Sequence, residues 1–319
     1  MKVLVTGAGG YIGSVLVGVL GEKGVVAGRP IQALAVADRH LDDLPDGVEP
    51  IAGDLGSDAV RTAIADFAPD VTFHLAAVPG GAAEADYDSG KRVNLDAALG
   101  LFETLAGMAP GREAPPVVVY ASTVAVYGTS LPELVTPATP LRPPITYGAH
   151  KLACEILLAD FSRRKVLDAR SLRLPGIVAR PRAPSGLVSA FMSDILHALA
   201  AGESFTCPVG PNSTAWWMSA RRCAENLVHA AGMDLRSADP ARAWPLPVLR
   251  LTMAEVVQTL SRIYGADRER LVRYAPQPGV EAVFGRFPKL DDSASRALGL
   301  RDDGSAEALV RRALGQPAE

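Results

Sequence analysis

Tyr147 and Lys151 are the side chains of this sequence whose types and spacing point most directly to chemistry. Residues four apart share one face of a helix, and residues 151–163 read as a helix, so the phenol and the ammonium point the same way. An ammonium close to a phenol favours the phenolate and lowers the pKa of the phenol. A tyrosine tuned towards neutral pH can act as a general base. The pair therefore predicts proton abstraction by Tyr147, with Lys151 as its electrostatic partner.

Two adjacent hydroxyl residues, Ser122 and Thr123, follow an apolar run at residues 116–121 that predicts a buried strand. A hydroxyl group both donates and accepts hydrogen bonds, so this pair can orient a substrate oxygen. A tyrosine and a lysine at this spacing also occur together by chance on helix surfaces. The hydroxyl pair and a nucleotide-binding pattern near the N-terminus make the combination far more specific than any of its parts.

Three glycines, Gly7, Gly10 and Gly13, lie between an apolar run at residues 2–6 and a helical apolar pattern at residues 11–20. Glycine permits a tight turn and lets the backbone approach a ligand closely. The N–H groups of a first helical turn, together with the helix dipole, bind anions such as a pyrophosphate. The arrangement predicts a dinucleotide site, although its spacing is G-x-x-G-x-x-G and not G-x-G-x-x-G. The predicted site includes the first helical residues, Tyr11 and Ile12.

Asp38 ends the next predicted strand, residues 31–38, and is the candidate for binding the adenosine ribose. A carboxylate there accepts hydrogen bonds from the ribose hydroxyls and repels a 2′-phosphate, which favours NAD. Arg39 follows directly and can accommodate such a phosphate, and a solvated strand end is the alternative for Asp38. For Asp54 a plain turn is the alternative to a place beside the adenine. The remaining predicted cofactor contacts are Asp54, Leu55, Leu75, Ala76, Ala77, Asn94 and Leu174, together with Tyr147 and Lys151.

Strands alternate with helices over the first 174 residues, which predicts an α/β fold. We expect a Rossmann doubly wound parallel sheet with helices on both faces, whose ligand binds beyond the carboxyl ends of the strands. The alternation is lost near Pro175. The sequence therefore predicts an NAD-binding domain at residues 1–174, completed by a later segment near 213–232. Residues 175–319 are expected to form mainly a smaller C-terminal α/β lobe that binds the substrate.

Charged and aromatic residues in the C-terminal part are candidates for substrate binding. A predicted loop at residues 175–186 carries Arg180 and Arg182, and a substrate carboxylate needs a cation or several N–H donors. A structural salt bridge is the alternative for Arg180. Trp216 and Trp217 lie in a predicted strand and point to opposite faces, so that either Trp216 lines a pocket or both rings pack. Thr252 and Glu255 form a predicted capping box at the start of a helix that reaches residue 264.

Composition limits the class of protein. The chain has 319 residues, 48% of them apolar, and a net charge of −3, which gives no electrostatic case for nucleic acid or an acidic membrane. Three widely spaced cysteines indicate a reducing compartment. A strand that begins at Lys2 leaves no room for a signal peptide, and no apolar run approaches about 18 residues, so we expect a cytoplasmic protein. The five histidines lack metal-ligand spacing, so no metal is expected, and His74 is expected to pack in the core.

The glycine triplet, Asp38, Ser122-Thr123 and the Tyr147–Lys151 pair together resemble the extended short-chain dehydrogenase/reductase, or NAD-dependent epimerase/dehydratase, family. The catalytic hydroxyl of that family lies four residues before the tyrosine of a Tyr-Gly pair, and Tyr127-Gly128 places Thr123 there. The resemblance implies that Tyr147 takes a proton from a substrate hydroxyl which Thr123 and Ser122 orient. It further implies that Lys151 binds the nicotinamide ribose, that Asn94 supports the nicotinamide side, and that hydride passes to NAD. Such proteins are commonly dimers through a helix pair that includes the tyrosine helix, so a homodimer is expected.

Within that family the sequence looks most like the D-erythronate dehydrogenase group, and the likeness covers nearly the whole chain. It implies NAD-dependent oxidation of the 2-hydroxyl of a short sugar acid to the 2-oxo acid. Two departures bear on the substrate: Pro79-Gly80-Gly81 replaces a Ser-Gly, and Ala183-Pro184-Ser185-Gly186 follows Arg180-Pro181. The motifs that carry the likeness include His74-Leu75-Ala76-Ala77-Val78, Arg92-Val93-Asn94-Leu95-Asp96, Arg173-Leu174-Pro175 and Ser219-Ala220-Arg221-Arg222.

Three other functions stay open at this point. A nucleotide-sugar epimerase has the same fold but usually carries an arginine for the diphosphate at the position of Thr214 here, although Arg221 and Arg222 are near in sequence. A dehydrogenase of L-threonine or of a uronic acid is a second alternative. The third is a nucleotide-sensing regulator without catalysis, and such proteins often lack the tyrosine–lysine pair.

Overall fold

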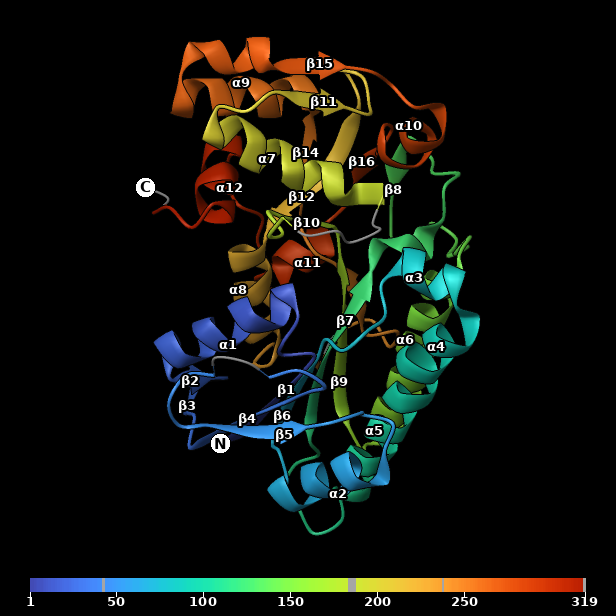
Figure 1. Cartoon of the computed structure of the whole chain (residues 1–319). Helices are drawn as coiled ribbons and strands as arrows, with labels where there is room; N and C mark the ends of the chain where they lie inside the picture. The colour runs from blue at the N-terminus through green and yellow to red at the C-terminus, as the bar shows by residue number, and fades with distance from the viewer. Residues whose placement is uncertain (42–43, 183–187, 237, 318–319) are drawn as a thin grey trace. The chain divides into compact units, whose positions relative to one another are not determined.

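The computed structural model describes residues 1–41, 44–182, 188–236 and 238–317, and the chain divides into two compact units (Figure 1). Unit 1 comprises Met1–Val126, Pro143–Arg173 and Ala224–Pro245. Unit 2 comprises Tyr127–Arg142, Leu174–Cys223 and Leu246–Glu319. The chain thus leaves unit 1 and returns to it twice. Residues 127–142, which the sequence placed in the first domain, belong to unit 2.

Unit 1 is built on a seven-stranded sheet with the order β13-β9-β7-β6-β1-β4-β5. The paired registers within this sheet are parallel. Its central strands are nearly continuous apolar runs, as expected for strands that are buried on both faces. The predicted doubly wound α/β fold is confirmed. The strands are β1 (Lys2–Thr6), β4 (Ala33–Asp38), β5 (Val48–Ala52), β6 (Val71–His74), β7 (Val117–Thr123), β9 (Asp168–Leu174) and β13 (Ala243–Pro245).

Helices cover both faces of this sheet. One face shares a core with α2 (Asp58–Phe67), α5 (Ala97–Gly107) and α6 (Thr146–Arg163), through side chains such as Ile64, Phe102 and Leu158. Figure 1 draws α1 (Tyr11–Lys23) on the other side of the sheet from α5 and α6. The shorter elements are β2 (Val25–Val26), β3 (Arg29–Pro30), α3 (Gly80–Ala85), α4 (Tyr87–Lys91), the π-helix η1 (Arg92–Asp96) and the 3-10 helix η2 (Val124–Tyr127).

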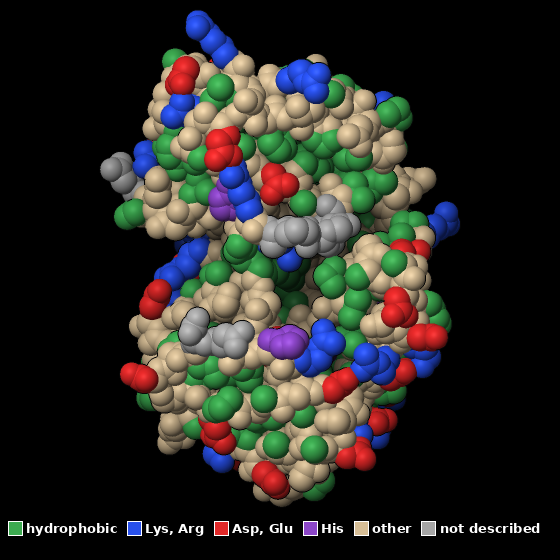
Figure 2. Space-filling view, viewed as in Figure 1, with side chains coloured by type: hydrophobic (Ala, Val, Ile, Leu, Met, Phe, Trp, Pro, Cys, Tyr) green, Lys and Arg blue, Asp and Glu red, His purple; other side chains and the backbone are tan. Residues whose placement is uncertain are grey.

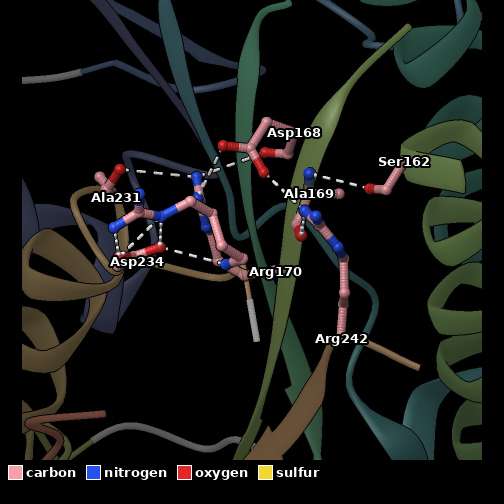
Figure 3. Close-up of polar contacts among 8 residues, drawn as sticks. Ser162, Asp168, Ala169, Arg170, Ala231, Asp234 and Arg242 are labelled. Atoms are coloured by element: carbon pink, nitrogen blue, oxygen red, sulfur yellow. Dashed lines mark hydrogen bonds and ion pairs between the residues drawn. The ribbon is translucent and has the colours of Figure 1, made fainter. Parts of the chain in front are cut away.

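The segment that returns to unit 1 is residues 224–245, further along the chain than the predicted 213–232. Its strand β13 pairs with β9, and ion pairs of buried Arg170 and partly exposed Arg242 with Asp168 lie at this junction (Figure 3). The guanidinium of Arg170 donates to Asp168 Oδ2 at 2.9 Å and to the carbonyl of Ala231 at 3.5 Å. Arg242 donates to Asp168 Oδ1 at 2.6 Å. Helix α8 (Ala220–Ala230) contributes residues to both units.

Unit 2 contains a three-stranded sheet of β10 (Gly176–Val178), β12 (Thr214–Ser219) and β14 (Leu249–Thr252). Helices α7 (Phe191–Ala201), α9 (Met253–Tyr264) and α12 (Ala306–Ala313) share a core with it. The predicted capping box at Thr252 and Glu255 is confirmed at the start of α9. The other elements are β8 (Leu134–Val135), η3 (Val188–Ala190), β11 (Phe205–Cys207), η4 (Ala266–Leu271), β15 (Val272–Tyr274), α10 (Pro278–Phe284), β16 (Lys289–Leu290) and α11 (Ser293–Ala297).

Two local predictions were wrong in ways that matter for the site. The predicted loop after Pro175 contains β10, because Gly176, Ile177 and Val178 pair in parallel with β12. Helix α6 begins at Thr146, five residues before the predicted start. The carboxylate of Glu84 accepts the Thr146 N–H, so a residue far away in sequence satisfies one of the free donors of this helix start.

Candidate active site

The predicted polar residues of unit 1 gather at one edge of its sheet. Strands β1, β4, β6 and β7 are parallel, so their carboxyl ends meet at the same edge. Thr6, Asp38, His74 and Thr123 are the last residues of these strands. The glycine turn follows Thr6 directly. The sheet therefore brings the predicted nucleotide-binding and catalytic residues of this unit together.

The glycine turn is packed too closely for larger residues. Gly7 has a φ of +74°, and its N–H donates to the carbonyl of Ala37 at 2.9 Å. A Cβ atom on Gly7 would lie 2.5 Å from the nitrogen of Ala76, and one on Gly13 would collide with the carbonyl oxygen of Gly7. The backbone of Leu75 and Ala76 thus lies against the turn, and contact of Leu75, Ala76 and Ala77 with the cofactor stays a prediction.

The start of α1 presents open N–H groups. Gly10 is its N-cap residue, and within the described ranges no side chain caps this helix. Tyr11 and Ile12 are half-buried in the first turn, which contains no acidic residue. The backbone N–H groups of a helix start that no described side chain caps, together with the positive end of the helix dipole, suit a pyrophosphate. The close glycine turn and the uncapped helix start fit the diphosphate of a dinucleotide.

Asp38 faces this turn from the end of β4. Its Oδ2 accepts the N–H of Gly9 at 3.0 Å, and its Oδ1 accepts the N–H of Arg39 at 2.7 Å. The carboxylate is therefore fixed beside the glycines. This position favours the predicted role at a ribose over the alternative, a solvated strand end.

Asp54 is engaged in a local network at the end of β5. Its Oδ1 accepts the N–H of Gly56 at 2.9 Å, and its Oδ2 pairs with Arg92. The Gly56 N–H and, to a smaller extent, the guanidinium of Arg92 hold the pKa of Asp54 below its usual value. Leu55 packs against the core of unit 1. Contact of Asp54 and Leu55 with the adenine stays a prediction.

Lys151 is buried beneath Tyr147 on α6. Its Nζ donates to the carbonyl of Ala121 at 2.9 Å and lies 5.7 Å from the centre of the Tyr147 ring and 4.7 Å from that of Tyr120. Burial lowers the pKa of Lys151 to about 8, and Cys154 and, to a smaller extent, the charge of Glu155 oppose this effect. The predicted helical pairing of Tyr147 with Lys151 is present, in the first turns of the helix.

The two hydroxyl residues of β7 differ in their surroundings. Ser122 is 2% exposed, and its hydroxyl donates to Glu155 Oε1 at 2.5 Å. Thr123 is half-buried, and its Oγ1 accepts the N–H of Ala125 at 3.1 Å. No described residue accepts the hydroxyl proton of Thr123. Thr123 is therefore the hydroxyl with a donor left for a substrate.

Sequence reasoning missed the partner of Ser122. Glu155 also accepts hydrogen bonds from Arg173 of β9, at 3.1 Å to Oε1 and 2.7 Å to Oε2. One signal was present in the sequence: Glu155 lies four residues after Lys151 on the same helix face.

Asn94 is 1% exposed within the π-helix η1. Its side-chain amide exchanges two hydrogen bonds with the backbone of Val78, at 2.7 and 3.0 Å. These bonds hold the chain just before Pro79-Gly80-Gly81, the first departure noted in the sequence. A Cβ atom on Gly80 would lie 3.7 Å from Tyr147 Cβ, so this departure adjoins the proposed base. Single π-turns are frequent at functional sites.

His74 packs in the core, as predicted. It is 1% exposed, its Nδ1 lies 2.6 Å from Thr6 Oγ1, and its ring stacks on Tyr120. Burial, and secondarily the charge of Lys151, lowers the pKa of His74 to about 3. The imidazole is neutral at the pH of any ordinary assay.

Burial of neutral His74 predicts a loss of stability in mild acid. Below its ordinary pKa of 6.5 the unfolded chain binds a proton that the folded chain excludes until about pH 3, so stability falls as the pH falls. Between pH 6.5 and 5.5 this linkage lowers the free energy of unfolding by about 1 kcal/mol. Urea unfolding of the wild type and of His74→Phe at both pH values measures the difference. Equal pH dependence in the two proteins would contradict the assignment, whatever their absolute stabilities.

The substrate candidates of unit 2 are placed as follows. The backbone N–H of Arg180 donates to Ser193 Oγ at 3.0 Å, and its carbonyl lies 2.8 Å from His197 Nε2. Arg182 forms an ion pair with Glu203 at 2.8 Å, and both side chains are about half exposed. Leu174, a predicted contact of the cofactor and not of the substrate, is buried at the end of β9. The second departure, residues 183–186, lies outside the described residues.

Trp216 and Trp217 are both buried in unit 2, at 1% and 0% exposure. The indole of Trp216 donates to the carbonyl of Pro288 at 2.8 Å, and its ring packs on Phe287. The arrangement corresponds to the alternative in which both rings pack. A contact of Trp216 with substrate stays a prediction.

The described ranges contain neither a metal-binding cluster nor a membrane-spanning helix. No group of three or more histidine, cysteine, aspartate and glutamate side chains there could hold a metal ion. None of the helices described is long and apolar enough to span a bilayer. Cys154, Cys207 and Cys223 are buried free thiols.

Comparison with known proteins places this arrangement in a family. Residues 3–233 match the family model described as the NAD dependent epimerase/dehydratase family. A D-erythronate dehydrogenase of Cupriavidus necator is 36% identical over 98% of this chain and 97% of its own length. A D-erythronate dehydrogenase of Haemophilus influenzae is 29% identical over 98% of each chain.

A solved structure agrees with the fold. The crystal structure of a nucleoside-diphosphate-sugar epimerase from Agrobacterium tumefaciens superposes with a TM-score of 0.91, at 31% identity over 98% of this chain and 92% of that one. The family match covers most of the chain, and the glycine turn, the sheet order and the tyrosine–lysine pair agree with it. The chain therefore belongs to the NAD dependent epimerase/dehydratase family and is an oxidoreductase of that family.

Proposed function

We propose that this protein oxidises the 2-hydroxyl of a four-carbon sugar acid, such as D-erythronate, to the 2-oxo acid with NAD. The observation that carries the proposal is the placement of Tyr147 over buried Lys151, in the same unit as Thr123 and the glycine turn. The full-length likeness to two D-erythronate dehydrogenases supports the substrate class.

The residues of unit 1 divide the chemistry among them. Tyr147, as a phenolate, accepts the proton of the substrate 2-hydroxyl. The ammonium of Lys151, 5.7 Å from the ring centre, stabilises that phenolate. The free hydroxyl proton of Thr123 orients the reacting oxygen, while Ser122 is engaged with Glu155. When bound, NAD supplies the acceptor for the hydride that leaves the adjacent carbon.

The cofactor and substrate contacts follow from the charges around the site. Asp38 beside Gly9 favours the free ribose hydroxyls of NAD over the 2′-phosphate of NADP. Arg180 and Arg182 are the proposed ligands of the substrate carboxylate. The exposed ion pair of Arg182 with Glu203 contributes at most about 1 kcal/mol, so a substrate carboxylate can replace Glu203 as its partner.

The proposed homodimer rests on family analogy. In unit 1, α4 and α6 leave two large apolar side chains exposed, Tyr87 at 57% and Ile156 at 63%. A helix pair that includes α6 would cover them.

A nucleotide-sugar epimerase is the second candidate, favoured by the Agrobacterium tumefaciens structure at 31% identity. At the position where epimerases usually carry an arginine, Thr214 donates its hydroxyl to the carbonyl of Phe287 at 2.9 Å. Arg250 lies 3.4 Å from that hydroxyl and supplies a nearby cation. Nucleotide sugars therefore belong among the compounds tested.

Initial rates of NAD reduction across a substrate panel test the proposal. The panel contains D-erythronate, D- and L-threonate, longer aldonic acids, uronic acids, L-threonine and UDP-sugars, each with NAD and with NADP. We expect the highest kcat/KM with a four-carbon aldonate and NAD. Epimerisation of a UDP-sugar, together with no reduction of NAD or NADP in the presence of any acid of the panel, would establish the second candidate instead. A preference for NADP would refute the role given to Asp38.

A further inference from the structure

Glu155 joins three elements of unit 1 in one buried contact. Its carboxylate accepts the hydroxyl of Ser122 from β7 and the guanidinium of Arg173 from β9, while Glu155 itself lies on α6. Glu155 is 3% exposed, Ser122 2% and Arg173 8%. Oε1 accepts from Ser122 and from Arg173 Nε, and Oε2 accepts from Arg173 Nε and Nη2. Both carboxylate oxygens are thus used.

A buried ion pair is a weak source of stability, because desolvation offsets most of the attraction between the charges. An apolar pair of similar volume would hold β9 against α6 at least as well. What an apolar pair could not do is bind the Ser122 hydroxyl or place a negative charge one helical turn from Lys151. The contact is therefore better explained by its effects on Ser122 and Lys151 than by a contribution to the stability of the fold.

The first neighbour is the pair of hydroxyls on β7. A serine hydroxyl has one proton to donate, and Ser122 donates it to Glu155. The same bond fixes the end of β7, where Ala121 accepts from Lys151 and Thr123 faces the other way along the alternating strand. Ser122 therefore has no hydroxyl proton left to donate to a substrate, whereas Thr123 does.

The second neighbour is the ammonium of Lys151. Burial lowers its pKa to about 8, and Cys154 and, to a smaller extent, the charge of Glu155 oppose that fall. A neutral amine would no longer stabilise the Tyr147 phenolate. The titratable and charged groups packed around the ammonium come from four elements: Tyr147, Cys154 and Glu155 of α6, Tyr120 of β7, His74 of β6 and Arg173 of β9.

We propose that Glu155, held by Arg173, is a positioning residue: it binds Ser122 so that Thr123 alone presents a hydroxyl proton, and it places a negative charge one helical turn from the ammonium of Lys151. The inference rests on the proposed function only in assigning Tyr147, Lys151 and Thr123 to the reaction. Its test needs one readout that is independent of any substrate.

That readout is the titration of Lys151, followed by NMR of the protein with ¹³Cε-labelled lysine and assigned with Lys151→Met. We expect a midpoint near pH 8 in the wild type and a lower midpoint in Glu155→Gln, because the negative charge that opposes the effect of burial is then lost. Asp168→Asn is the matched control, because it removes a carboxylate bound to buried Arg170 of the same strand β9. A midpoint that moves equally in both variants, or in neither, would overturn the inference.

Variants of Ser122 and Thr123 test the second part of the proposal, that Thr123 and not Ser122 donates a hydroxyl proton to the substrate. These variants do not depend on the folding of Glu155→Gln. With the substrate that the wild type oxidises, Thr123→Ala should lower kcat about 100-fold, and Ser122→Ala at most about 10-fold. An equal or larger loss in Ser122→Ala would show that Ser122 itself serves the substrate. If no acid is oxidised but the Lys151 midpoint still falls in Glu155→Gln alone, the proposed substrate class is wrong and the role of Glu155 stands.

Discussion

Replacement of Tyr147 by phenylalanine should lower kcat by a factor of about 10³ and leave NAD affinity within about twofold of the wild type. The phenolic hydroxyl is the only group removed, and a general base in the transition state contributes about 10² to 10⁴ in rate. The ring itself remains, and Lys151 keeps its hydrogen bond to the Ala121 carbonyl. The position of the ammonium relative to the ring is therefore preserved. Steady-state kinetics and NADH fluorescence titration measure the two effects separately.

Tyr87→Phe is the matched control for this substitution. Tyr87 lies on α4 of the same unit, is 57% exposed, and its ring is 6.0 Å from that of His150. It should retain wild-type kcat. A Tyr147→Phe protein that keeps more than a tenth of the wild-type kcat would exclude Tyr147 as the base. A wild type that binds NAD but turns over no compound of the panel would favour the nucleotide-sensing alternative.

The sequence predicted those parts of the site that depend on local spacing. Tyr147 and Lys151 are four residues apart, and Gly7 to Gly13 span a single turn, so each group carries its geometry within a few residues. The sheet then assembled them, because parallel strands put Asp38 and Thr123 at the same edge whatever lies between them in the chain. The alternation of strands and helices predicted this parallel sheet, and with it the edge at which the residues meet.

The parts that sequence reasoning missed depend on partners distant along the chain. Helix α6 starts at Thr146 because Glu84, from α3, accepts its N–H. Strand β10 exists because β12 pairs with it, although prolines and arginines surround it in sequence. The bond between Glu155 and Arg173 joins a helix to a strand, and its register is set by the packing of α6 on the sheet. Periodicity and spacing do not identify the distant partner in such contacts.

Alanine at Gly13 should abolish tight NAD binding, and alanine at Gly18 of the same helix should not. A Cβ atom on Gly13 would meet the carbonyl oxygen of Gly7 and lie 2.8 Å from the Cα of Ala8, and both are backbone atoms that cannot rotate away. The glycine turn must therefore move from the start of α1, where the open N–H groups lie. Loss of one or two charge-assisted hydrogen bonds, about 3 kcal/mol, corresponds to a rise in Kd of about 100-fold.

Gly18 provides the control because it shares α1 but not the crowding. It is exposed, and a Cβ atom there would have no neighbour within 4 Å. Because glycine inside a helix is less stable than alanine by about 0.5 to 1 kcal/mol, Gly18→Ala should stabilise the protein by that amount and leave the Kd for NAD unchanged. Gly13→Ala should instead lower the free energy of unfolding by about 1 to 3 kcal/mol, as overpacked sites do. Calorimetric titration with NAD and urea unfolding of both variants give all four values. Wild-type NAD affinity in Gly13→Ala would mean that the cofactor does not bind at this turn, because a residue larger than glycine at position 13 must displace the turn.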